Sequence, residues 1–270
     1  MISAAPFDEE WLTREHARLM SSGRASVPWD ACTASSLDAT TRARIAALWR
    51  ARADSERCSV AIFSTWAIDL VGAGAEAPFL SLVTRATLDE VRHAALFDRL
   101  AEAYGAAPSP PSRDLPTMPD DARIPLRWQA SREALELSII GEGFSVTLLH
   151  ELREHARDPA VRAALAVVLG DEAAHARIGW LWLSHVRSDP DARDLFGWLQ
   201  AELPMAFARF EDAVFGLDDG ASDDGDDEAL RAHGACSRAR MKTLYEALYD
   251  TLWRDGLRAL GLELPPRRSR

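Results

Sequence analysis

Two copies of one short motif constrain this chain more than any other feature of its sequence. Asp-Glu-x-x-His ends at His93 in one segment and at His175 in another, and both segments carry the apolar periodicity of a helix. Residues at positions i and i+3 share a helix face, so each motif can present a carboxylate and an imidazole to one point. One such pair is common on solvated helix surfaces, whereas two matching pairs indicate a shared site.

Helical periodicity runs along most of the chain, and no run of residues alternates as a strand would. Breaks rich in Gly and Pro divide the pattern into four long helices, expected at about 38–73, 78–104, 127–157 and 160–187. Their connections are short, long and short, which predicts two antiparallel hairpins joined by a crossover. We therefore predict an all-α fold in one domain, 1–270.

Three further helices are expected outside the bundle core of 38–187, at about 7–20, 190–216 and 227–260. Between the last two lies the acidic segment LDDGASDDGDDE, residues 217–228. It lacks the ligand order of a calcium-binding loop, and this favours a solvated linker.

The motif residues Glu90, His93, Glu172 and His175 stand on the apolar stripes of their helices, where core residues are expected. Because such a stripe normally faces the core, we expect both motifs to point into the bundle.

The other two helices each place one glutamate on an apolar stripe, Glu56 and Glu142. The motif glutamates follow them by 34 and 30 residues. A helix rises about 1.5 Å per residue, so each interval runs up one helix and down its neighbour to a similar depth. Because no local motif marks these two positions, Asp54 and Glu136 are alternatives.

Four buried glutamates with no Lys or Arg on their stripes would each cost several kcal/mol if uncompensated. Two divalent cations would balance the four charges, and oxygen and nitrogen ligands suit iron or manganese. A purely structural cluster is the alternative. Asp89 and Asp171 are expected to accept a hydrogen bond from the histidine of the opposite motif, fixing its tautomer; for them the alternative is an exposed helix acid.

Composition excludes several other classes of protein. A net charge of -11 without a basic stripe argues against a nucleic-acid partner. No apolar run reaches the roughly 20 residues that span a bilayer. The three cysteines form no CxxC, which argues against a cysteine-based zinc or iron–sulfur site. Scattered cysteines and the lack of a secretory signal predict a cytoplasmic protein.

Residues 40–187 resemble the ferritin-like di-iron superfamily, which includes bacterioferritins, rubrerythrins, the small subunit of class I ribonucleotide reductase and bacterial multicomponent monooxygenases. The resemblance implies a ferritin-like bundle that holds two iron ions, or a manganese–iron pair, with dioxygen or peroxide as the partner of the metal. It implies as ligands Glu56, Glu90, His93, Glu142, Glu172 and His175.

Departures from the known branches narrow the expected activity. Rubrerythrins usually add a CxxC iron module, which is absent, and Phe97 stands where the reductase subunit carries its radical tyrosine. We expect an oxidase or oxygenase that uses dioxygen to oxidise a small organic substrate. Such an enzyme needs an external electron donor or reductase. A homodimer is compatible with this function. Residues expected to form a substrate pocket are Phe63, Trp66, Phe97, Gly141, Gly143 and Phe144; for the glycines, close helix packing is the alternative.

Two other functions fit the same residues. One is iron handling or peroxide removal of the ferroxidase or peroxidase type, without an organic substrate. The other is a ferritin-like scaffold in which the metal only stabilises the fold.

Overall fold

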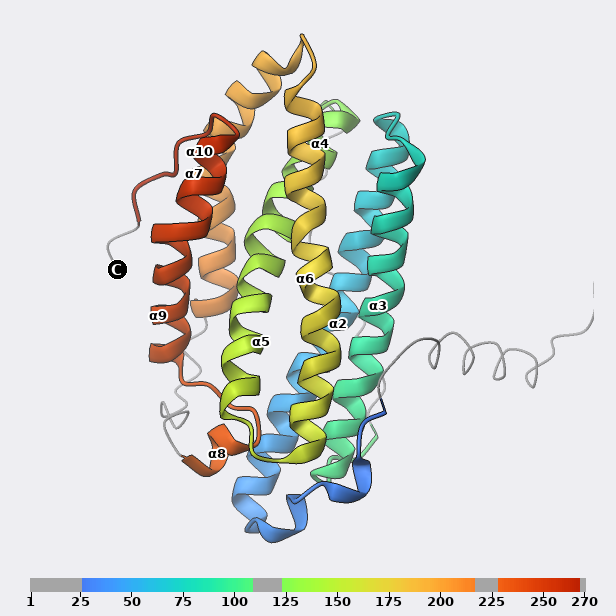
Figure 1. Ribbon diagram of the computed structural model, residues 1–270, viewed down its shortest axis with the longest axis vertical. Coiled ribbons are helices and arrows are strands. Elements are labelled where there is room, and N and C mark those ends of the chain that lie inside the picture. The colour runs from blue at the N-terminus through green and yellow to red at the C-terminus, as the bar shows by residue number, and fades with distance from the viewer. Residues whose placement is uncertain (1–25, 109–122, 217–227, 268–270) are drawn as a thin grey trace, which may run out of the picture.

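The computed structural model describes residues 26–108, 123–216 and 228–267 of the chain. Within these ranges the chain forms helices and no strand, which confirms the predicted all-α class. The long helices run side by side along the longest axis of the molecule (Figure 1). They are α2 (Ala39–Gly72), α3 (Ala77–Ala103), α5 (Gly143–His155) and α6 (Pro159–Arg187).

Helix boundaries follow local chemistry where the sequence carries a cap. The Asp38 carboxylate accepts hydrogen bonds from two backbone amides in the first turn of α2. Asp158 does the same for α6, and Pro159 occupies the first turn of that helix, where its missing N–H costs nothing. Three of the four predicted core helices, α2, α3 and α6, begin and end within one residue of their expected bounds.

The prediction of one α-helix over 127–157 is wrong. That stretch contains α4 (Leu126–Glu133), a π-helical segment (Ala134–Glu142) and α5. A π-helix has i→i+5 hydrogen bonds and leaves carbonyl groups misaligned with the regular ladder. The indole Nε1 of Trp253 donates to one of them, the carbonyl of Ile139, at 2.9 Å.

Of the two helices predicted in the C-terminal part of the chain, the structure confirms the first and not the second. Helix α7 (Ala192–Phe215) matches the expected 190–216. The single helix expected over 227–260 is wrong, because the chain there forms α8 (Glu228–Ala232), α9 (Arg238–Leu248), a π-helical segment (Tyr249–Trp253) and α10 (Arg254–Ala259). The chain turns at Gly234, which has φ +90° and lies so close to Trp49 that a Cβ atom would come within 2.5 Å of its ring. The expected helix 7–20 and the acidic residues 217–227 lie outside the described residues.

Buried apolar side chains form two clusters, one toward each end of the bundle. One contains Phe63 and Ile178, and it extends to α7 and α9, which pack beside α5 (Figure 1). The other contains Trp49, Phe97 and Leu165. Polar side chains of α2, α3 and α6 occupy the level between the clusters. Of the helices that the structure describes, none combines the length and the apolar character needed to cross a membrane.

Candidate metal centre

Four stretches of helix each contribute one glutamate to the polar level between the two apolar clusters. Glu56 comes from α2, Glu90 and His93 from α3, Glu142 from the end of the π-helical segment, and Glu172 and His175 from α6. Five of these side chains are buried and Glu56 is half-buried. The structure thus brings all six predicted ligand residues together.

The six residues divide into two overlapping groups, and in each group the potential ligand atoms lie within 4.8 Å of one another. Glu90 and Glu172, the motif glutamates, belong to both groups. One group adds Glu56 and His93, and the other adds Glu142 and His175. Each group could hold one metal ion, with the two shared carboxylates lying between the ions.

Both imidazole rings turn Nδ1 toward the carboxylates. In His175 this nitrogen lies 2.9 Å from Glu90 Oε1 and 3.0 Å from Glu172 Oε2. In His93 it lies 3.1 Å from Glu172 Oε1. The ring centroids are 5.8 Å apart. Nδ1 is therefore the ligand atom that each histidine offers.

The second nitrogen of each ring faces an aspartate of the opposite motif. His93 Nε2 lies 3.2 Å from Asp171 Oδ2, and His175 Nε2 lies 3.6 Å from Asp89 Oδ2. Asp89 is in turn held by ion pairs with Arg85 at 2.9 Å and Arg92 at 2.8 Å. The contact between His93 and Asp171 is the crossed hydrogen bond expected from the sequence, whereas His175 Nε2 faces Asp89 at a distance too long for a hydrogen bond. A carboxylate on Nε2 favours the tautomer in which Nδ1 carries a free lone pair.

Without a cation, protons must balance the charge of the cluster. Burial raises the pKa of Glu142 well above its usual value, and the charges of Glu172 and Glu90 raise it further. Burial also raises the pKa of Glu56. Burial alone would lower the pKa of His175, but the carboxylates of Asp89, Glu172 and Glu90 raise it to about 11. Divalent cations would replace these protons, which is the usual linkage between metal binding and pH.

Unpaired buried atoms give an independent test of whether metal ions fit the cluster. Both carboxylate oxygens of Glu90 and Nδ1 of His93 are buried without a hydrogen bond of good geometry. Buried polar atoms normally have a partner, because leaving them without one costs about 1–3 kcal/mol each. These atoms carry lone pairs that converge on one point, so a cation fits the site.

The two alternative acids lie outside the cluster. Asp54 forms an ion pair with Arg57 at 2.6 Å, and Glu136 pairs with Arg209 of α7. Neither belongs to a group of converging ligand atoms. Of the residues considered from the sequence, Glu56 and Glu142 are the ones that meet the motifs.

The residues predicted to form a substrate pocket are not all brought together. The ring of Phe63 meets His175 edge-on at 5.4 Å, and Trp66 packs on Phe63. Phe97 belongs to the other apolar cluster, where it packs on Trp49 at 5.3 Å. A substrate pocket formed by these residues stays a prediction.

The two glycines and Phe144 near Glu142 have packing contacts. A Cβ atom on Gly143 would come within 3.2 Å of Trp253 Nε1, and on Gly141 within 3.3 Å of a backbone oxygen of the same π segment. Phe144 packs on Phe210 of α7 at 5.4 Å. Close packing therefore explains at least Gly143.

Ser138 and Gly179 support His175 and were not predicted from the sequence. The Ser138 hydroxyl donates to the backbone carbonyl of His175 at 2.6 Å and accepts from the amide of Gly179 at 2.7 Å. A Cβ atom on Gly179 would come within 2.3 Å of the carbonyl oxygen of Ala134, so the glycine permits this close approach. The contact depends on the π-helical register, which no sequence pattern marked.

The fold and the site define a helical bundle with a buried Glu/His cluster that could bind metal. Comparisons with known protein families, with curated proteins and with solved structures give no match to this chain. Its function must therefore be inferred from its own residues.

Proposed function

We propose that the chain is a ferritin-like di-iron protein that uses dioxygen to oxidise a small organic substrate. The proposal rests on one observation: the two groups of potential ligand atoms share Glu90 and Glu172. Each group then has three carboxylates and one imidazole, and four glutamates balance the charge of two Fe²⁺ ions. Glutamates combined with Glu-x-x-His pairs on facing helices are typical of di-iron and di-manganese carboxylate bundles.

Iron ions held there would supply electrons to dioxygen, and the side chains of this protein would set how they do so. Glu90 and Glu172 would contribute ligand atoms to both ions, because each belongs to both groups. Asp171 and Asp89 orient the two histidines through Nε2. Trp66 and Phe63 are fully buried on one side of His175 and help to exclude water.

Iron handling is the competing function, and it predicts a different stoichiometry. A di-iron oxidase binds two equivalents of Fe²⁺ and then needs an external electron donor to turn over. An iron-handling protein oxidises many equivalents and assembles into a large oligomer. A cytoplasmic location, with access to a reductase, belongs to the first proposal.

The test is an anaerobic Fe²⁺ titration of the full chain, followed by mixing with air-saturated buffer in a stopped-flow spectrometer. We expect two equivalents to bind and an oxygen-dependent absorbance change to follow. Glu90→Gln and His175→Ala should each abolish the change. His155→Ala is the matched control, because that histidine is exposed and pairs with Glu151 of its own helix.

Binding of two ions with no response to oxygen would leave a structural metal site and contradict the oxidase proposal. Oxidation of many equivalents by a large oligomer would establish iron handling instead. No binding of Fe²⁺ or Mn²⁺ at all would contradict the metal centre itself.

A further inference from the structure

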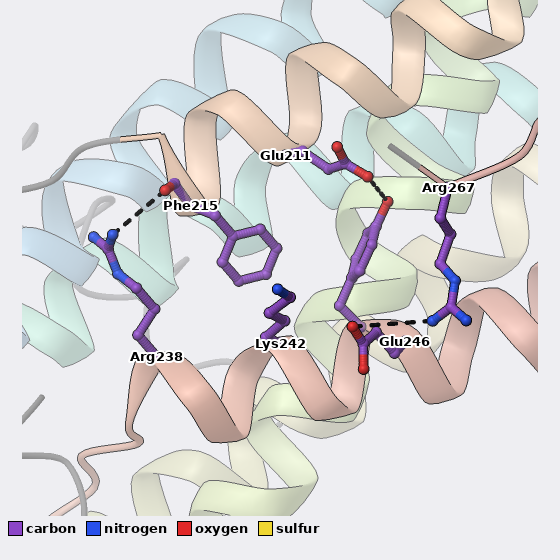
Figure 2. Close-up of a pocket in the computed structure, with 7 residues that line it drawn as sticks. Glu211, Phe215, Arg238, Lys242, Glu246 and Arg267 are labelled. Carbon is purple, nitrogen blue, oxygen red and sulfur yellow. Dashed lines mark hydrogen bonds and ion pairs between the residues drawn. The ribbon is translucent and has the colours of Figure 1, made fainter. Parts of the chain in front are cut away.

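A second candidate binding site lies between α7 and α9, on the side of the molecule formed by the C-terminal helices (Figure 2). The cavity has a volume of about 200 Å³. Its lining residues come from α7, from α9 and from the segment after α10: Glu211, Phe215, Arg238, Lys242, Tyr245, Glu246 and Arg267. None of them belongs to the candidate metal centre.

One wall of the cavity is aromatic and fixed in place. Tyr245 is buried, and its hydroxyl donates to the Glu211 carboxylate at 2.7 Å. Its ring stacks on Phe210 at 5.9 Å and meets Phe215 edge-on at 5.6 Å. Both rings line the cavity and contact each other, so they form one continuous wall. This wall offers a preformed apolar surface to a ligand.

The charges at the cavity are unusual for this chain. Lys242 is the only lysine among its 31 Lys and Arg residues, and it lines the cavity together with Phe215 (Figure 2). It forms no hydrogen bond or ion pair with a residue that the structure describes. Lysine presents a compact charge that an anion can approach from several directions.

The other charged groups at the cavity have partners. Arg267 lies 3.5 Å from Asp250 and 4.0 Å from Glu246, and Arg238 donates to the carbonyl of Phe215 at 3.4 Å. The Glu211 carboxylate accepts from the Tyr245 hydroxyl. Three cations and two carboxylates line the cavity, and Asp250 is a third acid beside Arg267. Among the residues that the structure describes, Lys242 is the lining cation without an acidic partner.

We propose that this cavity binds a small organic carboxylate, with its acid group on Lys242 and its apolar body against the wall that Tyr245 and Phe215 form. The volume is below the roughly 300–1,000 Å³ of sites for drug-sized ligands, so it suits a single ring or a short chain. The aromatic wall favours a flat apolar body, and the ammonium group of Lys242 favours an anion over an amine. This ligand site is separate from the metal chemistry proposed above.

The single lysine allows a direct test on the full chain. Reductive methylation with ¹³C-formaldehyde labels only Lys242 and the N-terminal amine, and it preserves the positive charge. Phenylacetate is titrated while the two methyl signals are followed by NMR. We expect the Lys242 signal to shift saturably and the N-terminal signal to stay unchanged. The neutral analogue phenylacetamide and the amine phenethylamine should bind at least tenfold more weakly.

Calorimetric titration of variants distinguishes the contribution of the Lys242 charge to phenylacetate binding from the contribution of its aliphatic stem. Lys242→Met keeps the aliphatic stem and should weaken phenylacetate binding at least tenfold, whereas Lys242→Arg should retain most of it. Arg254→Met is the matched control, since it removes an exposed cation of α10 that pairs with its neighbour Asp255. Protein as purified and protein treated with a chelator are compared, so that binding to a metal ion is recognised.

Binding that survives Lys242→Met, or that requires metal, would overturn the assignment of the site. A preference for phenethylamine would show that the two acids dominate the cavity and would also overturn it. Failure of the wild-type protein to bind phenylacetate would do the same. None of these outcomes depends on the proposed reaction with dioxygen, because the cavity is tested in the chelator-treated protein.

Discussion

Glu133 is a buried acid outside the candidate metal centre, and it shows what one residue can contribute to pH dependence. It lies on α4 and is 1% exposed. Burial, the charge of Asp69 and the hydrogen bond between the two carboxyl groups together raise its pKa to about 9, against the effect of Arg132. Glu133 is therefore protonated in the folded protein at neutral pH.

A pH-dependent loss of stability follows from this. The unfolded chain releases the Glu133 proton near the ordinary pKa of 4.5, whereas the folded chain keeps it up to about 9. Between these values the folded state binds more protons, so stability falls as pH rises, by up to about 1.4 kcal/mol per pH unit for one proton. Glu133→Gln should flatten the fall in denaturation curves at pH 5, 7 and 9.

Glu102→Gln, an exposed site at the end of α3, is the control and should leave the slope unchanged. An identical slope in Glu133→Gln and wild type would show that the buried acid is not protonated as argued.

At the scale of residues, the sequence predicts those site residues whose positions follow from spacing within a single helix. The ligands of the two motifs follow from i and i+3 spacing within one helix, and Glu56 and Glu142 from their positions on apolar stripes. The contact between Glu133 and Asp69 joins α4 and α2 across the bundle, and no spacing within either helix indicates it. Sequence periodicity identifies a face, but it does not say which residues of two faces meet.

At the scale of elements, the π-helical segment is joined to α6 by Ser138. Its hydroxyl lies between the carbonyl of His175 and the amide of Gly179, groups that bond each other directly in a regular helix. Ser138→Ala removes both hydrogen bonds in a buried place. We expect a loss of about 1 kcal/mol of stability, since the two backbone groups can still pair with each other.

The same substitution should also weaken metal binding, because the backbone of a predicted ligand shifts. Denaturant unfolding measures the first effect and Co²⁺ titration the second. Ser64→Ala is the matched control, since its hydroxyl donates to the carbonyl of Val60 within α2. If both variants bind metal equally well, Ser138 does not position His175.

Elements with local signals were predictable and elements held by tertiary contacts were not. Asp38 and Asp158 cap α2 and α6, and these helices lie where the sequence places them. The π-helical segment has no such signal, because its register is supported from outside by Trp253 and by the close approach at Gly179. The turn at Gly234 likewise fits against Trp49, a residue distant in sequence.

At the scale of the whole molecule, the polar cluster divides the apolar core into two. Such a division lowers stability, since a buried acid pays a desolvation cost that apolar packing would avoid. Metal ions that bind only the folded protein should recover this loss. At a free concentration a hundred times the dissociation constant, one bound ion adds about 2.7 kcal/mol, or roughly 5–10 °C in melting temperature for a chain of this size.

Differential scanning fluorimetry of the chelator-treated protein, with Fe²⁺ under anaerobic conditions or with Mn²⁺ or Co²⁺, measures this shift. Mg²⁺ should give a smaller shift, because it retains its water and prefers oxygen ligands to imidazole. Glu142→Gln should lose most of the stabilisation by metal, whereas Glu136→Gln, which removes the partner of Arg209 on the same segment, should keep it. Equal stabilisation of the two variants would mean that the ions bind elsewhere, and the divided core would then need another explanation.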